Sequence, residues 1–192
     1  MIRPHLVTCA AVTVFLSSAV QADVKQPSWD FFSISYDNVS ASDSDFRPSG
    51  FGLLGASSIG QKGVMYARYQ RSDDEVAEQK LELEQIRIAA GGSFDNWEKT
   101  DIYGLVGYSS RELEGIEDRR EDGLTLSIGV RSLLFAELEL GATAHYIDYS
   151  EGGESELDLS AQYYFSDGFS VGLLYQSADD YDTTSAQISI HY

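Results

Sequence analysis

The chain has 192 residues and a formal net charge of −18, from 31 acidic and 13 basic side chains. This excess of acid argues against a nucleic-acid-binding protein, which needs a basic surface. It also disfavours simple electrostatic attraction to anionic lipid headgroups. A single domain is the default for a chain of this length.

Residues 1–22 have the features of a secretory signal peptide. Arg3 is followed by an apolar run from Leu6 to Val20 without any acid or base, and small residues stand at the spacing that signal peptidase accepts. The run is shorter than the ~20 residues of a membrane-spanning helix. We therefore predict cleavage after Ala22 and one domain over residues 23–192. The only cysteine, Cys9, lies in the predicted signal, so that domain has no thiolate and no disulfide.

From Trp29 onward, apolar and polar residues alternate with period two in about ten segments, which predicts an all-β chain. No later segment is apolar enough for a membrane helix, so any membrane role depends on strands. Each segment is close to the ~9–11 residues with which a tilted strand crosses a membrane. We expect strands at residues 28–38, 49–60, 63–72, 80–91, 100–110, 122–132, 136–149, 155–165, 168–177 and 183–192.

The connections between these segments fall into two alternating sets. One set is mostly short, at residues 60–63, 132–137 and 165–168, with 92–100 the longest. The other set is longer and acidic, at residues 37–50, 71–80, 109–123, 149–155 and 177–184. This alternation predicts consecutive antiparallel strands, with short turns at one end and long loops at the other. That arrangement is typical of a transmembrane β-barrel.

The last segment shows the expected faces most clearly. Ala186, Ile188, Ile190 and Tyr192 share one face, and the serines, Gln187 and His191 share the other. The second half of the chain follows this rule, whereas the second to fifth segments have apolar residues on both faces. We expect the apolar face to meet lipid and the polar face to line the interior.

Aromatic residues are predicted to form two belts at the ends of the strands, with aliphatic residues between them. The belt near the long loops would contain Tyr36, Tyr69, Tyr108, Tyr146 and Tyr175. The belt near the short turns would contain Trp29, Trp97, Phe135, Phe165, Phe169 and Tyr192.

A signal peptide, about ten alternating strands, acidic loops and an aromatic last residue together resemble the small bacterial outer-membrane β-barrels of the OmpA/OmpX-like kind. The resemblance implies a single antiparallel up-and-down barrel in the outer membrane, in contact with outer-membrane lipid and lipopolysaccharide. It also implies that the barrel-assembly machinery reads the last strand, where members commonly end in Phe and this chain has Tyr192. Familiar members have eight strands, so eight is the alternative to ten. The resemblance includes no residue motif and carries no active site.

Both signs of charge are expected inside the barrel, on Arg68, Arg87, Arg131, Glu137, Glu139, His145, Asp158 and Gln162 with their neighbours. Because buried charges are tolerated when they are paired, a mutually paired plug is the leading interpretation. A narrow conducting path along the same residues is the alternative. We expect neither a metal site nor a cofactor.

The sequence disfavours two enzyme classes. Outer-membrane lipid A deacylases use a histidine and a serine two apart on one strand face, but position 147 after His145 is Ile. Omptin proteases are much longer chains, and their Asp and His groups have no matching motif here. The sequence thus favours a non-enzymatic structural or surface-interaction protein, with an extracellular partner at the acidic loops. A narrow channel for ions or small solutes and a soluble, lipocalin-like periplasmic barrel are the alternatives.

Overall fold

The computed structural model describes residues 27–41, 47–76, 79–97, 99–114, 119–150, 152–179 and 181–192. The signal peptide predicted for residues 1–22 lies outside these ranges. The described part contains no helix that is long and apolar enough to cross a membrane. Its elements are ten strands: β1 Phe31–Ala41, β2 Ser49–Ile59, β3 Gly63–Val76, β4 Gln79–Trp97, β5 Thr100–Glu114, β6 Arg119–Phe135, β7 Leu138–Tyr149, β8 Gly152–Ser166, β9 Phe169–Ser177 and β10 Tyr181–His191.

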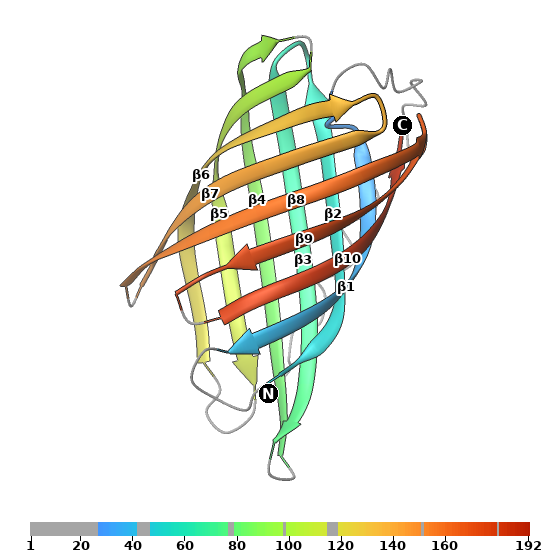
Figure 1. Ribbon diagram of the computed structural model, residues 1–192. Coiled ribbons are helices and arrows are strands. Elements are labelled where there is room, and N and C mark those ends of the chain that lie inside the picture. Colours follow the sequence, from blue (N-terminus) through green and yellow to red (C-terminus); the bar gives the residue numbers. More distant parts are fainter. Residues whose placement is uncertain are drawn as a thin grey trace.

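The ten strands form one closed barrel in which each strand pairs antiparallel with its neighbours in sequence. The first and last strands close it, with a register that runs from Phe31 opposite His191 to Ala41 opposite Tyr181. Closure leaves no unpaired sheet edge. The prediction of an antiparallel up-and-down barrel with ten strands is confirmed, and the eight-strand alternative is wrong (Figure 1).

The barrel has two different ends. The terminal end holds Phe31 and His191 with the β2–β3, β4–β5, β6–β7 and β8–β9 turns, and the loop end holds the other five connections. The acidic stretches predicted as long loops are largely strand. In the stretch 71–80, for example, β3 continues to Val76 and β4 starts at Gln79. The β3–β4 hairpin therefore projects beyond the neighbouring strands at the loop end (Figure 1).

One predicted short connection is also strand. Residues 92–100 were expected to be a loop, but β4 continues to Trp97 and β5 starts at Thr100. The β4–β5 pairing shifts register between Ser93 and Asp95. Such a β-bulge adds one residue to one strand, which interrupts the alternation of faces without ending the ladder.

The two surfaces of the barrel have opposite chemistry. Along β6, the outward residues Leu124, Leu126 and Ile128 are 59–66% exposed, whereas the intervening Thr125 and Ser127 are buried in the lumen. A water-soluble barrel has the reverse arrangement, with a polar exterior. The lipocalin-like alternative is therefore contradicted.

The interior also has an apolar part, which explains the mixed faces of the second to fifth strands. A buried cluster fills the lumen at the terminal end, beside β1 to β5. It consists of Trp29, Phe31, Ala56, Val64, Ala89, Tyr103 and Leu105, with Leu54 and Tyr66 packed against it. These strands are apolar on both faces because one face meets this cluster and the other faces outward.

Candidate functional site

The middle of the lumen is bridged by an ion pair between opposite strands. Arg87 on β4 donates to both carboxylate oxygens of Glu156 on β8, at 2.8 and 3.0 Å. Gln176 on β9 donates a further hydrogen bond to Glu156 over 2.9 Å, and Arg87 also donates to Ser109. A bidentate Arg–carboxylate pair is among the strongest charge-assisted contacts. It holds opposite walls together.

A second contact crosses the lumen next to this pair. The Arg68 guanidinium on β3 lies 3.6 Å from the Asp158 carboxylate on β8. Arg68 also donates to the side-chain oxygen of Gln176. Since Gln176 contacts both Arg68 and Glu156, the two crossings form one network.

His145 joins this network through both ring nitrogens. Its Nδ1 lies 2.7 Å from the Ser127 hydroxyl, and its Nε2 lies 3.3 Å from the Asp158 carboxylate. A serine, a histidine and an aspartate in a row are the groups of a nucleophilic hydrolase. Here all three are buried, and Asp158 also faces Arg68. The row is therefore integrated into the plug.

Among the described residues, His145, Glu156 and Asp158 could bring ligand atoms within 4.8 Å of one another, as a metal site requires. However, both oxygens of Glu156 accept hydrogen bonds from Arg87. Two guanidinium groups next to the cluster already balance its two carboxylates, so a divalent cation would add uncompensated positive charge. The donor set does not fit a resident cation.

The terminal end of the lumen is closed by residues that precede β1. The Trp29 indole donates to the Asp101 carboxylate on β5 over 2.6 Å and packs edge-on against Tyr103, with ring centroids 4.6 Å apart. The Arg131 guanidinium lies 4.6 Å above the Trp29 ring and donates to the carbonyl oxygen of Ser28. Ser28 and Trp29 are thereby fixed at the terminal end of the lumen.

Arg131 also anchors this closure to the wall of the barrel. Its Nε donates to Glu139 over 2.7 Å, and the Tyr164 hydroxyl donates to the other oxygen of Glu139 over 2.8 Å. A hydrogen-bonded group of Gln162, Ser170 and His191 lies at the same end.

The loop end has a third crossing, centred on Arg111 of β5. Arg111 pairs with Glu121 at 2.6 Å and with Glu154 at 2.9 Å, and it lies 5.0 Å above the Tyr149 ring. Leu124 pairs with Tyr108, which belongs to the aromatic belt near the loop end. Glu121 lies three residues nearer the loop end than Leu124, and therefore outside that belt. Burial alone would raise the pKa of Glu121, but hydrogen bonds and charge from Arg111 outweigh it and lower the pKa.

The predicted interior residues lie in these layers with one exception. Arg68, Arg87, Arg131, Glu139, His145, Asp158 and Gln162 are buried in the lumen. Glu137 is a correction, because it lies in the β6–β7 turn and is exposed. The alternation that places Glu139 inward holds only within β7, which begins at Leu138, so it does not extend to Glu137.

The predicted aromatic belts need one correction. Tyr36, Tyr108, Tyr146 and Tyr175 are exposed on the outer surface near the loop end, and Tyr69 is half-buried beside Phe51. Trp97, Phe135, Phe165 and Phe169 are exposed near the terminal end, and Tyr192 is half-buried. Trp29 does not belong to a belt, because it is only 8% exposed and closes the lumen.

The alternation of faces places Glu156, Gln176 and Ser127 on the polar side of their strands, but sequence reasoning did not predict that they, with Asp101, are the partners that complete the network. A signal existed for Ser127, because it lies opposite His145 in the β6–β7 register. No such signal existed for the pairing of Glu156, because its partner Arg87 is on the far side of the barrel.

Several solved outer-membrane barrels are similar to this chain. The KdgM porin in complex with disordered oligogalacturonate is 9% identical, with a TM-score of 0.49, and the alignment covers 83% of this chain and 99% of that one. The outer membrane protein OprG from Pseudomonas aeruginosa is 10% identical, with a TM-score of 0.47 and coverages of 88% and 100%.

Ail, the attachment invasion locus protein of Yersinia pestis, is 14% identical in its complex with a heparin analogue, with a TM-score of 0.44 and coverages of 84% and 94%. Identities and TM-scores this low transfer neither ligand nor activity to this chain. No curated protein matches the sequence. The family model described as outer membrane protein beta-barrel domain matches residues 7–192. The chain therefore belongs to the outer-membrane β-barrel family.

Proposed function

We propose that this protein is a non-enzymatic, non-conducting outer-membrane barrel with a structural or surface-interaction role. The observation that supports the proposal is the bridging of the lumen by paired side chains at three levels. These are Arg131 with Glu139 and Trp29, Arg87 with Glu156, and Arg111 with Glu121 and Glu154. Ions that pass through the middle of the lumen would have to break these buried, charge-assisted contacts.

The second candidate is a narrow channel, and the polar wall of the lumen favours it. Ser185, Ser189 and Thr183 line β10 with buried hydroxyl groups, and Ser170 lies on β9. A path along this wall would avoid the ion pairs, but the wall would have to move to open it, because these side chains are at most 2% exposed.

Planar-bilayer recording separates the two candidates. The purified full barrel is expected to give no discrete conductance steps in potassium chloride, because its ion pairs cross the lumen. A variant with Arg87→Ala, Glu156→Ala, Trp29→Ala and Arg111→Ala removes contacts at all three levels and is expected to conduct. Glu137→Ala, in an exposed turn, is the matched control and should stay silent. Regular steps from the unmodified barrel would establish the channel instead.

We further propose that the terminal end faces the periplasm and the loop end faces outside, as in barrels with short periplasmic turns. The signal would then be cleaved after Ala22, and β10 would be read by the barrel-assembly machinery. The projecting β3–β4 hairpin and the acidic residues of the loop end would contact lipopolysaccharide and an extracellular partner.

The two tryptophans give a direct test of the lipid-facing surface. Trp97 is 58% exposed on the outer surface, whereas Trp29 lies in the lumen. In vesicles of brominated phospholipid, the fluorescence of a Trp29→Phe variant, which retains Trp97, is expected to be strongly quenched. A Trp97→Phe variant, which retains Trp29, should be quenched much less. Equal quenching of the two variants would contradict the assignment of inside and outside.

A further inference from the structure

The loop half of the lumen contains a buried carboxylate that has no ion-pair partner among the described residues. Asp37 on β1 is 1% exposed. Its Oδ2 accepts a hydrogen bond from the Gln70 amide over 3.1 Å, whereas its Oδ1 has no hydrogen-bond partner. Burying an ionised carboxylate without a counterion is costly. Asp37 therefore needs a positive charge that its own hydrogen bonds do not provide.

The ion pairs in the middle of the lumen do not supply this charge. Arg87 is paired with Glu156, and Arg68 faces Asp158. Arg68 is close enough to Asp37 for their charges to interact, but it is shared with Asp158. Two guanidinium groups thus face three carboxylates. One negative charge in this part of the lumen stays uncompensated.

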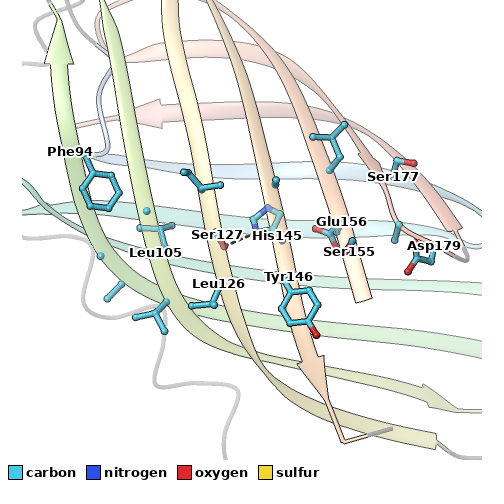
Figure 2. A pocket seen from close by; sticks show the side chains of 18 residues that line it. Phe94, Leu105, Leu126, Ser127, His145, Tyr146, Ser155, Glu156, Ser177 and Asp179 are labelled. Carbon is cyan, nitrogen blue, oxygen red and sulfur yellow. Dashed lines mark hydrogen bonds between the residues drawn. The ribbon is translucent and has the colours of Figure 1, made fainter. Parts of the chain in front are cut away.

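His145 is the other group in this region that can carry a positive charge. Its Nδ1 is hydrogen-bonded to Ser127, and Figure 2 shows this contact beside Glu156. Its Nε2 faces Asp158, so a proton there would serve Asp158 first. Three strands separate β7 from β1 in the closed order. Imidazoles also lose their charge above about pH 8, so His145 does not neutralise Asp37 under alkaline conditions.

Two further hydroxyl groups lie next to Asp37 on the inner wall. Ser185 on β10 is directly opposite Asp37 in the register, is fully buried, and has a hydroxyl without a hydrogen-bond partner. On the other side, a Cβ atom at Gly52 of β2 would collide with both the Ser35 hydroxyl and the Asp37 carboxylate, so these two groups meet over the glycine. Ser35 points inward and is only half-buried, which leaves accessible space beside it. Oxygen atoms from two strands thus surround Asp37.

We propose that Asp37, Ser185 and Ser35 bind one monovalent cation, such as Na⁺, inside the barrel. Carboxylate and hydroxyl oxygens are hard ligands, which suit a hard cation. One positive charge compensates the carboxylate, whereas a divalent ion would leave an excess of positive charge. A water molecule would satisfy the two unpartnered oxygens but not the charge. The bound cation would be a structural component of the lumen, and the site does not depend on whether the lumen conducts.

The dependence of stability on the type of cation tests this site. The full barrel is unfolded by urea in phosphatidylcholine vesicles at about pH 8.5, where imidazoles are neutral. Sodium chloride is compared with tetramethylammonium chloride at equal ionic strength, because the larger cation screens charge equally but does not fit between three side chains. Sodium is expected to lower the equilibrium constant of unfolding about tenfold, as for a site filled at about ten times its Kd. Asp37→Asn should abolish this difference, and Ser185→Ala should reduce it.

The matched control is Asp148→Asn, which makes the same change at an exposed position of β7 and should keep the sodium effect. Heat-modifiable gel migration verifies that each variant is folded.

Crystals provide a direct second measurement. Soaking the unmodified barrel in a thallium(I) salt should give anomalous density between Asp37 and Ser185, and Asp37→Asn crystals should lack it. Absence of that density, equal stability in the two salts, or a sodium effect that survives Asp37→Asn would overturn the proposal. Conductance is a separate measurement, so failure here leaves the proposed function intact.

Discussion

Glu156→Gln is expected to lower the free energy of unfolding of the barrel by about 3–5 kcal/mol, the usual cost of breaking a buried ion pair from one side. Glu156 is 3% exposed and accepts from Arg87 with both oxygens. A neutral amide would leave the buried Arg87 charge without its counterion and would present an NH₂ group where an acceptor is needed. Urea-induced unfolding in lipid vesicles, followed by tryptophan fluorescence, measures the loss.

Glu137→Gln is the matched control, because it makes the same chemical change in an exposed turn. Its effect should stay within about 0.5 kcal/mol. Arg87→Met combined with Glu156→Leu removes both charges and should recover most of the stability, since an apolar pair of similar volume often replaces a buried ion pair without loss. If Glu156→Gln were no more harmful than Glu137→Gln, the central bridge would not stabilise the barrel.

The number and pairing of the strands could be predicted from the sequence because side chains on a strand alternate with an exact period of two. In β10, Ile188 and Ile190 face outward between buried Gln187, Ser189 and His191. The strand ends could not be predicted in this way. Backbone hydrogen bonds between β3 and β4 continue to Val76 opposite Gln79, beyond the region where one face is apolar. Strands that pair outside the membrane do not need alternating apolar and polar residues. The alternation in the sequence therefore ends before the strands do.

The position of Trp29 is indicated by the alternation of inward and outward residues along β1, although it was predicted to lie in an outer belt. Ile34 and Tyr36 face outward on β1, whereas Ser33 and Asp37 face inward. Trp29 has an odd number, like the inward residues of β1, which indicates an inward position. The usual preference of tryptophan for the membrane interface favoured an outward position instead. The preference of tryptophan for interfaces is a tendency, whereas strand parity is geometric.

The partners across the lumen are beyond what a single sequence predicts. Neighbouring strands share a register, so Ser127 and His145 could be matched from the β6–β7 turn. Arg87 and Glu156 lie on β4 and β8, which are separated by three strands in the closed order. Their relative height depends on the stagger accumulated around the barrel, including the shifts at the β4–β5, β6–β7 and β8–β9 pairings.

Trp29→Ala is expected to lower the free energy of unfolding by about 3–5 kcal/mol, the range for truncating a buried tryptophan. The change removes the donor to Asp101, the edge-on partner of Tyr103 and the ring beneath Arg131. Asp101 is itself 3% exposed, so its carboxylate would keep the hydrogen bond from Ser93 but lose that of the indole. Urea unfolding in vesicles again gives the magnitude, with tyrosine or circular-dichroism signals replacing the lost fluorophore.

Trp97→Ala is the internal control, because it removes the same side chain from the outer surface, where it is 58% exposed. Its cost should be no more than about 1 kcal/mol, since the site leaves no cavity and no unpaired partner. Trp29→Phe should fall between the two, because the ring still packs on Tyr103 and Arg131 while Asp101 loses its donor. If Trp97→Ala proved the more harmful change, Trp29 would not be the residue that closes the barrel.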